Sequence, residues 1–279
     1  MRDRLFSFVF IALLAALIGS IAVFIVADIS YIKGPDLLEI MRSPEISFSV
    51  VLTLITSIVT TAFCILFAVP SAYALSRFKI KGAAALDMII DLLMVLPVLV
   101  VGVSILVFFR VGSLWAVSPV LPVALMGKGI TFLGDVFIYK QAGIVLAQFF
   151  CSVPFAVRVI KSSFDDLSPR LEQVAQTLGC DRWRAFWDVS LPLARHGILA
   201  GAVLAWARAF GLFGPISIIA GAVRKKTEVL STSIFLEISI GRLESGIAIS
   251  LFMVAIAVIV LLLMRFVSGK ALMGKGGNA

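Results

Sequence analysis

The sequence predicts an all-α polytopic membrane protein with six transmembrane helices. Of its 279 residues, 61% are hydrophobic and 14% are charged, and the mean hydropathy is +1.12, whereas soluble domains carry about 25% charged residues. Six apolar runs reach the roughly twenty residues with which a helix crosses a ~30 Å hydrocarbon core. One polar and amphipathic stretch, 168–192, interrupts this pattern. We expect a single transmembrane domain, 1–279, that contains this stretch as a loop.

The six predicted spans follow the apolar runs. They cover 5–27, 48–76, 84–109, 141–162, 197–221 and 246–267. The first follows Arg2 and Arg4 like a signal peptide, but its run is long and has no convincing cleavage site, so we expect an anchor. Pro70, Pro97 and Pro154 lie inside the second, third and fourth spans, where a proline removes a backbone hydrogen bond and favours a kink. Such kinks suit either a bundle that rearranges or a particular packing geometry.

The distribution of Lys and Arg predicts the orientation. With the N-terminus inside, fourteen of the 24 basic residues fall in cytoplasmic segments and nine in external ones, as the positive-inside rule requires. An even number of spans then returns Lys275 to the cytoplasm. We therefore expect a multi-pass protein of the cell membrane with both termini cytoplasmic. This topology also explains the net charge of +8, so no nucleic-acid partner is needed.

Four further segments have predicted surroundings. Asp87 and Asp91, one helical turn apart at the start of the third span, are expected to meet Arg or Lys near the cytoplasmic interface. A proton-relay role for these acids is the alternative. The external segment 110–140 is rich in Gly and Pro and is expected to be a membrane-skimming loop with a short helix. Another helix is expected at 229–240.

The sequence contains no catalytic constellation. Cys64, Cys151 and Cys180 lack the spacing of a disulfide framework or a zinc site, and we expect all three to be buried. His196 is the single histidine and has no partner pattern that indicates catalysis. No Gly-x-x-x-x-Gly-Lys-Ser/Thr phosphate loop occurs. We therefore expect neither an ATP site nor a metal or cofactor in this chain.

The polar stretch reads SPRLEQVAQTLGCDRWRAFWDVSLP and predicts two short helices. Ser168 and Pro169 suit the start of the first helix, and Gly179 suits the turn that ends it. Asp181 is expected to cap the second helix, which the final Leu-Pro pair should stop. The apolar stripes comprise Leu171, Val174, Ala175 and Leu178 in the first helix and Trp183, Phe186 and Trp187 in the second.

This stretch resembles the EAA loop of ABC importer permeases, whose pattern is Glu-Ala-Ala, three residues, Gly, nine residues, an aliphatic residue, any residue, Leu-Pro. Here Gln173-Val174-Ala175, Gly179, Val189 and Leu191-Pro192 keep every spacing, and Glu172 supplies a carboxylate one position earlier. The resemblance implies a type I ABC importer permease whose cytoplasmic coupling helix docks on a separate ATPase. The implied coupling residues are Glu172, Gln173, Val174, Ala175, Leu178, Gly179, Leu191 and Pro192. An ordinary amphipathic loop is the alternative.

Arg208 is the second feature that points to function. It lies eleven residues into the fifth span, about 16 Å at 1.5 Å per residue and hence near mid-membrane. A charge at this depth is costly, so it indicates a transport pathway or a structural pairing. The glycines and the proline that follow it weaken the helix. Phe210 and Phe213 are expected to share a helix face and to form an apolar plug.

This segment resembles the Ala-Arg-x-x-Gly-Glu-Phe-Gly motif of the molybdate, tungstate and sulfate branch of these permeases, with Leu212 in place of Glu. The resemblance covers most of 45–267. It implies the channel-forming subunit of an ATP-driven importer of molybdate- or tungstate-type oxyanions, or of sulfate or another small solute such as thiamine or ferric iron. The implied pathway and gate residues are Arg208, Phe210, Gly211, Phe213 and Gly214.

The resemblance also implies the partners. These are a second copy of the chain, two cytoplasmic ATPase subunits that bind the ATP, an extracytoplasmic solute-binding protein and membrane lipid. A secondary transporter is the competing class, but neither an internal repeat nor a charged route for an ion stands out. A membrane enzyme would need a nucleophile–base pair or a metal set.

Overall fold

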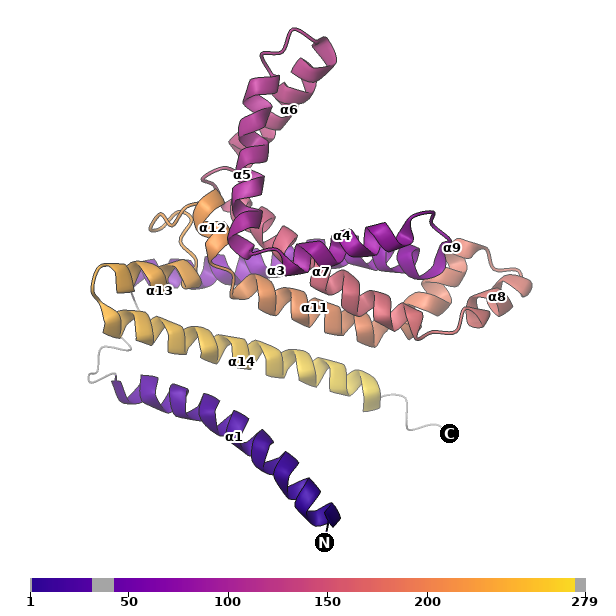
Figure 1. The fold of residues 1–279 in the computed structure, drawn as a ribbon, viewed down its shortest axis with the longest axis horizontal. Helices are drawn as coiled ribbons and strands as arrows, with labels where there is room; N and C mark the ends of the chain where they lie inside the picture. Colours follow the sequence, from indigo (N-terminus) through magenta and orange to yellow (C-terminus); the bar gives the residue numbers. More distant parts are fainter. Residues whose placement is uncertain (1, 32–42, 274–279) are drawn as a thin grey trace.

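The computed structural model describes residues 2–31 and 43–273, and the regular elements in these ranges are helices (Figure 1). The predicted cytoplasmic position of Lys275 lies outside the described residues. The longer helices are α1 (Arg2–Tyr31), α3 (Pro44–Arg77), α5 (Val98–Trp115), α6 (Leu121–Phe137), α7 (Gln141–Asp165), α11 (Arg195–Phe210) and α14 (Leu243–Met273). The shorter ones are α4 (Ala83–Val95), α8 (Arg170–Thr177), α9 (Arg182–Ala185), the π-helix η1 (Phe186–Ser190), α10 (Leu191–Leu193), α12 (Gly214–Ile219) and α13 (Leu230–Ser239).

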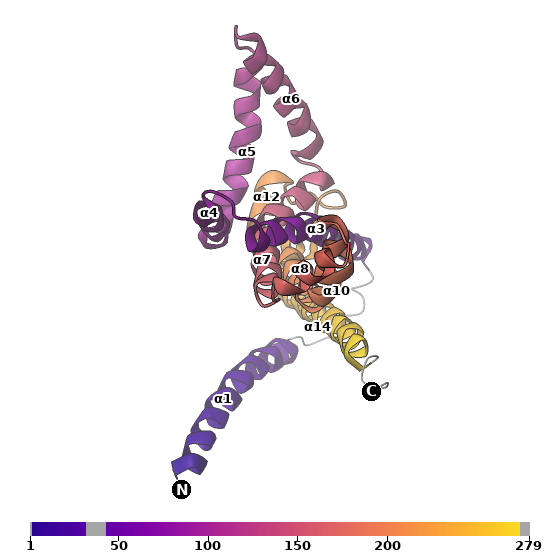
Figure 2. The same cartoon turned by 90° about the vertical axis from the view of Figure 1, so that its right-hand side faces the viewer.

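Helices α3, α7 and α11 form the centre of the bundle and lie side by side in both views (Figures 1 and 2). Small residues bring α11 close to α7: a Cβ atom built on Gly201 would lie 2.8 Å from Cγ1 of Ile160, and one on Gly197 would overlap the side chain of Ser163. Glycines at such positions let helix backbones approach closely in a membrane, where packing drives association. The centre of the bundle is therefore specified by small side chains.

A buried glutamine links the three central helices. Thr60 of α3 donates a hydrogen bond to Oε1 of Gln148 (2.8 Å), and Nε2 of Gln148 donates one to the carbonyl oxygen of Ala209 on α11 (3.0 Å). Buried polar groups must be paired, and interhelical hydrogen bonds of this kind contribute about 0.6–2 kcal/mol each in membranes. Gln148 thus fixes the relative positions of α3, α7 and α11.

The predicted number of spans agrees with the structure. Five described helices are long and apolar enough to cross a membrane, and a bent pair of helices is the sixth candidate. The five segments are Phe6–Tyr31, Pro44–Arg77, Val98–Trp115, Gln141–Asp165 and Leu243–Met264; the bent pair is Arg182–Leu193 with Arg195–Phe210, at 69°. Pro70 and Pro154 lie within α3 and α7, as predicted. The protein is a multi-pass helical membrane protein.

The third predicted span, 84–109, is not one helix. It divides at Leu96 and Pro97 into α4 and α5, which run in different directions (Figure 1). The backbone of Leu96 is extended, with ψ 134°, because the ring of the following proline disfavours the helical conformation of the residue before it. Pro97 therefore ends one helix and starts the next rather than kinking a continuous one.

The fifth predicted span, 197–221, is also divided. Helix α11 ends at Phe210, and α12 begins at Gly214 with Pro215 in its first turn, where a missing amide hydrogen costs nothing. Phe213, between the two helices, has φ −121° and ψ −65°. The sequence indicated a weakened helix here, but the helix ends completely.

Helices α5 and α6 form an antiparallel hairpin that projects from the bundle (Figures 1 and 2). The segment 110–140, expected to be a loop with a short helix, is instead mostly helical, because α5 continues to Trp115 and α6 adds 17 residues. Glycines let the two helices touch: a Cβ atom on Gly127 would lie 2.1 Å from the backbone nitrogen of Ala116, and one on Gly112 would lie 2.4 Å from Cγ2 of Ile130. These contacts make the hairpin a packed unit.

Other predictions about individual residues have mixed outcomes. Arg158 forms ion pairs with Asp87 and Asp91, as expected, and the predicted helix at 229–240 is α13. Cys64 and Cys151 are buried. Cys180, which was also expected to be buried, is only half-buried and directly follows the turn that ends α8.

Candidate functional site

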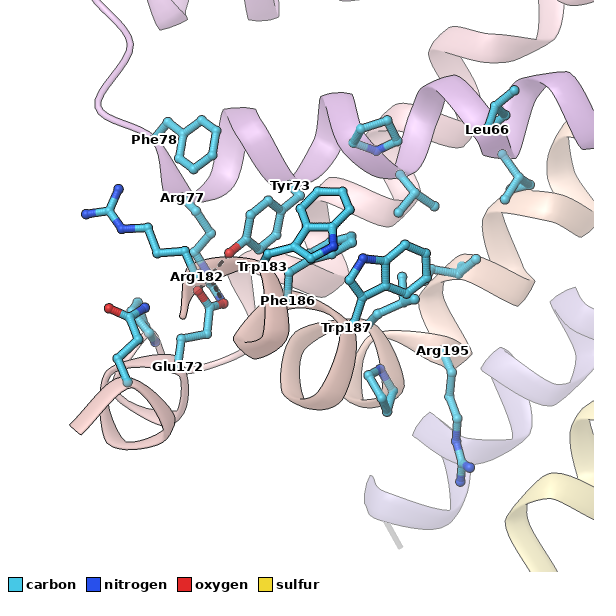
Figure 3. Close-up of a pocket in the computed structure, with 18 of the residues that line it drawn as sticks. Leu66, Tyr73, Arg77, Phe78, Glu172, Arg182, Trp183, Phe186, Trp187 and Arg195 are labelled. Atoms are coloured by element: carbon cyan, nitrogen blue, oxygen red, sulfur yellow. Dashed lines mark hydrogen bonds and ion pairs between the residues drawn. The ribbon is translucent and has the colours of Figure 1, made fainter. Parts of the chain in front are cut away.

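The polar stretch forms a helical layer at one end of the bundle, beside the C-terminal end of α3 (Figures 1 and 3). Helix α8 starts at Arg170, after Pro169, and no side chain caps it; the expectation that Ser168 would be the cap is therefore wrong. Asp181 does cap α9, as predicted, by accepting a hydrogen bond from the amide of Arg184 at 2.7 Å. The predicted pair of short helices is confirmed.

Helix α8 presents most of its apolar stripe to the outside. Leu171, Val174 and Leu178 are 46%, 57% and 80% exposed, whereas Ala175 is buried against the rest of the chain. Three apolar side chains on one exposed helix face form an unpartnered surface, which is the usual mark of a protein or membrane contact. We call these three residues the α8 face.

Glu172 anchors the opposite side of α8. Its carboxylate accepts hydrogen bonds from Nε of Arg77 (2.8 Å), the hydroxyl of Tyr73 (3.0 Å) and the hydroxyl of Ser190 (2.7 Å). Arg77 and Tyr73 belong to α3 (Figure 3), and Ser190 belongs to η1, so the Glu172 side chain links α8 to two other elements. Arg77 also donates a hydrogen bond to the carbonyl oxygen of Leu167, just before α8. We call Glu172, Arg77, Tyr73 and Ser190 the Glu172 clamp.

Electrostatics keep the clamp charged. Burial by itself would raise the pKa of the Glu172 carboxyl, but the hydrogen bonds from Arg77, Ser190 and Tyr73 outweigh it and hold the pKa below its ordinary value. The ion pair is largely shielded from water, with side-chain exposures of 8% for Arg77 and 11% for Glu172. In such a setting, removal of one partner leaves an uncompensated buried charge.

Gly179 supplies the turn between α8 and α9. Its φ is +95°, and the amides of Gly179 and Cys180 donate hydrogen bonds to the carbonyl oxygens of Gln176 and Ala175. This pair of bonds is the Schellman motif, in which a glycine in a left-handed conformation ends the helix. A Cβ atom at this position would meet nothing within 4 Å. Within this chain, Gly179 therefore serves the backbone conformation rather than a close contact.

The second helical run ends at Leu193, one residue after the Leu191–Pro192 pair that was predicted to stop it. The run passes through η1 and α10, and the chain then bends by 69° into α11. Pro192 lies in the first turn of α10. The aromatic side chains of this segment contact one another, with ring centroids 6.0 Å apart for Trp183 and Trp187 and 5.5 Å apart for Phe186 and Trp187.

The residues predicted for the gate do not form a single cluster. Arg208 is exposed on α11 with its guanidinium 4.6 Å from the centre of the Phe155 ring. Phe210 is buried and stacked on Trp206, at 4.9 Å. Phe213 is half-buried and lies 5.1 Å from Phe235. The expectation that Phe210 and Phe213 share a helix face is wrong, because α11 ends between them.

The two glycines of this segment also have different surroundings. Gly211 is exposed, and a Cβ atom there would meet only the carbonyl oxygen of Ala207, at 3.7 Å. Gly214 packs against α5, where a Cβ atom would lie 2.7 Å from Cδ2 of Leu99. Gly214 thus allows α12 to approach α5, whereas Gly211 caps the C-terminal end of α11 and is exposed.

Sequence reasoning missed three members of the clamp. Tyr73, Arg77 and Ser190 carry no motif of their own, and Arg77 is 95 residues from Glu172 along the chain. The available signal was a basic residue at the cytoplasmic end of the second span together with a carboxylate on the buried side of the amphipathic helix.

A multi-pass bundle that carries an exposed amphipathic helix at one end, joined to a membrane helix by an ion pair, is typical of the membrane subunit of a transport complex. The chain belongs to the family of binding-protein-dependent transport system inner membrane components, whose model matches residues 64–272. It is therefore the permease subunit of an ABC importer. This assignment confirms the resemblance stated from the sequence.

Relatives with assigned names support the family. The chain is 34% identical over 227 residues to the molybdate/tungstate transport system permease protein WtpB of Pyrococcus furiosus, covering 81% of this chain and 78% of the relative. It is 32% identical over 232 residues to the molybdenum transport system permease protein ModB of Escherichia coli (82% and 96% covered). It is 31% identical over 200 residues to the sulfate transport system permease protein CysT of Escherichia coli (72% and 68% covered).

The fold matches a solved transporter. A chain of a bacterial alginate ABC transporter, in complex with an alginate-bound periplasmic protein, superposes with a TM-score of 0.69 at 17% identity, covering 93% of this chain and 94% of that one. At this identity the likeness concerns the fold.

Proposed function

We propose that this permease forms, with a second copy of itself, the membrane pathway of an ATP-driven importer of molybdate- and tungstate-type oxyanions. The names of the WtpB and ModB relatives support this substrate class. An exposed arginine on a central membrane helix, Arg208, supports an anionic solute. Sulfate is the second candidate, because the CysT relative is a sulfate permease.

The observation that carries the proposal is the arrangement of α8, with an exposed apolar face on one side and the Glu172 clamp on the other. We propose that the α8 face docks in a groove of a cytoplasmic ATPase subunit, which binds and hydrolyses the ATP. The coupling residues would then be Glu172, Gln173, Val174, Ala175, Leu178, Gly179, Leu191 and Pro192. Any displacement of α8 passes through the clamp to α3 and, through Ser190 and the bend that follows α10, to α11.

The complex works by alternating access in this proposal. When ATP closes the two ATPase subunits, the paired α8 helices move together and the pathway opens outward toward an extracytoplasmic solute-binding protein. Release of the nucleotide products reverses the movement. Both termini then lie in the cytoplasm, on the same side as α8, as the distribution of Lys and Arg predicts.

The proposed pathway lies along the exposed side of α11 and its broken end. Arg208 and Gly211 are exposed there, Phe213 is half-buried, Phe210 supports the segment from the protein interior, and Gly214 holds α12 against α5. The guanidinium of Arg208 rests on the Phe155 ring, and no described residue accepts a hydrogen bond from it, so its N–H groups can bind an anion. The non-helical segment between α11 and α12 gives the gate a point at which the backbone can bend.

The proposal is tested by uptake in proteoliposomes that contain the permease, its ATPase subunit and its solute-binding protein. We expect ATP-dependent uptake of labelled molybdate. An excess of unlabelled tungstate should inhibit this uptake, whereas the same concentration of sulfate should not. Uptake of labelled sulfate that molybdate fails to inhibit would favour the second candidate. Absence of uptake for all three oxyanions, with ATP hydrolysis stimulated by the binding protein, would contradict the substrate class.

A further inference from the structure

A long, largely apolar groove lies between α3 and the segment from α8 to α10, which we call the coupling segment, and it continues along the start of α11 (Figure 3). Its volume is about 1250 Å³. Along α3 it runs from Ile65 to Arg77, about 18 Å at 1.5 Å per residue, which is a little more than half of a ~30 Å hydrocarbon core. We call this feature the interfacial groove.

The inner part of the interfacial groove is lined by aliphatic residues and prolines. The lining includes Leu66 and Pro70 of α3 and Leu199 of α11, and Leu66 is 65% exposed. The surface is continuous with the part of α3 that lies within the membrane. An apolar channel of this length at this depth fits one leaflet's acyl chain.

The mouth of the groove has a different chemistry. The indole rings of Trp183 and Trp187 stand between the coupling segment and α3 (Figure 3) and are 69% and 49% exposed. Exposed tryptophans of this kind gather at the membrane–water boundary, where the ring contacts acyl chains and its N–H contacts headgroups. Two exposed indoles at the mouth therefore fit a position at the level of the lipid headgroups.

A basic side chain completes the mouth. Arg182 lines it and is exposed, and among the described residues no carboxylate forms an ion pair with it. The charge of Arg77, deeper in the same wall, is balanced by Glu172. The guanidinium of Arg182, beside two exposed indoles at the end of an acyl-sized channel, is complementary to a phosphate headgroup.

We propose that the interfacial groove binds an anionic phospholipid of the cytoplasmic leaflet, with an acyl chain between α3 and α11 and the phosphate at Arg182. The bound lipid contacts both α3 and the coupling segment, so it supports the end of the bundle to which the Glu172 clamp is attached. This inference rests on the orientation proposed above, in which α8 and α9 face the cytoplasm.

Quenching of tryptophan fluorescence by brominated lipids tests the proposal. The full chain is placed in nanodiscs of phosphatidylcholine that contain a low, equal mole fraction of brominated phosphatidylglycerol or brominated phosphatidylcholine. We expect stronger quenching by the brominated phosphatidylglycerol. A variant with Trp183→Phe and Trp187→Phe should lose this difference, because the remaining tryptophans, Trp115 and Trp206, lie outside the groove.

Two arginine variants locate the headgroup. Arg182→Gln should weaken the phosphatidylglycerol-specific quenching about fivefold, as expected for one basic residue at an anionic surface. Arg184→Gln is the matched control, because Arg184 is exposed on the same helix but does not line the groove. The fluorescence of this variant should be quenched to the same extent as that of the unmodified protein. Equal elution in size-exclusion chromatography checks that each variant is folded.

Three results would overturn the proposal: equal quenching by the two lipids, a specific difference that survives loss of both groove tryptophans, or equal effects of Arg182→Gln and Arg184→Gln. The lipid composition is the same in both leaflets of a nanodisc, and neither ATP nor oxyanion is present. Failure of this experiment therefore leaves the proposed transport activity untouched, and failure of oxyanion uptake leaves the lipid site untouched.

Discussion

At the scale of single residues, the Glu172 clamp shows how a charged group can be kept inside a helical layer. Glu172 and Arg77 are both shielded from water, and each satisfies the other. A buried ion pair contributes less than its geometry suggests, because removing both charges from water is costly. Loss of one charge is worse than loss of both, since the remaining charge has no partner. The clamp therefore makes a prediction about pairs of substitutions.

Glu172→Gln and Arg77→Met should each lower the free energy of unfolding by roughly 3–5 kcal/mol, because each leaves one buried group without its partner. The double variant should lose less than the sum of the two. Unfolding by SDS in mixed micelles measures these free energies, and the double-mutant cycle gives the interaction term. Gln173→Glu, on the same helix, is the control. Strictly additive losses would show that the ion pair does not hold α8 on α3.

Gly179 allows a second experiment at this scale. Its φ of +95° costs a residue with a Cβ atom about 1–2 kcal/mol, but nothing in the chain lies close enough to clash. Gly179→Ala and Gly179→Leu should thus be similarly destabilised. If an ATPase subunit packs on this turn, Gly179→Leu should in addition uncouple ATP hydrolysis from transport, whereas Gly179→Ala should largely retain coupling. Normal transport by a well-expressed Gly179→Leu protein would contradict the coupling assignment.

At the scale of helices, the sequence predicts membrane spans well and their breaks poorly. Uninterrupted apolar runs gave α1, α3, α7 and α14, because any run of this length must be helical in lipid. The same criterion merged α4 with α5 and α11 with α12, since hydropathy does not distinguish a proline that kinks a helix from one that starts a new helix. The amphipathic spacing of α8 was visible, but its pairing with Arg77 depends on how distant helices pack.

The break after α11 leads to a prediction about the gate. Phe213→Ala removes the half-buried ring that contacts Phe235, so we expect anion leakage or ATP hydrolysis without transport. Arg208→Ala should lower oxyanion uptake severalfold while assembly with the ATPase stays intact. Both effects are measured in proteoliposomes. Phe155→Leu is the control for Arg208, because it removes the ring under the guanidinium and keeps the charge. Unchanged uptake by Arg208→Ala would remove this residue from the proposed pathway.

At the scale of the whole molecule, the bundle has two chemically different ends. Helices α8 and α9 occupy one end, and α12 and α13 occupy the other (Figure 1). The two acidic side chains Asp87 and Asp91 pair with Arg158 toward the first end. The orientation of the bundle in the membrane decides which partner can reach each end, and native and introduced cysteines can measure it.

A membrane-impermeant maleimide should label Cys180 in inside-out vesicles and leave it unlabelled in intact cells. Cys180 is half-buried at the coupling end, whereas Cys64 and Cys151 are buried within α3 and α7 and should react slowly. In a Cys180→Ala background, cysteines at Asp3 and at Lys275, the latter outside the described residues, should behave as Cys180 does. Lys226→Cys, exposed at the opposite end, should show the reverse pattern. Efficient labelling of Cys180 or of position 3 in intact cells would invert the topology and remove α8 from the side where ATP is available.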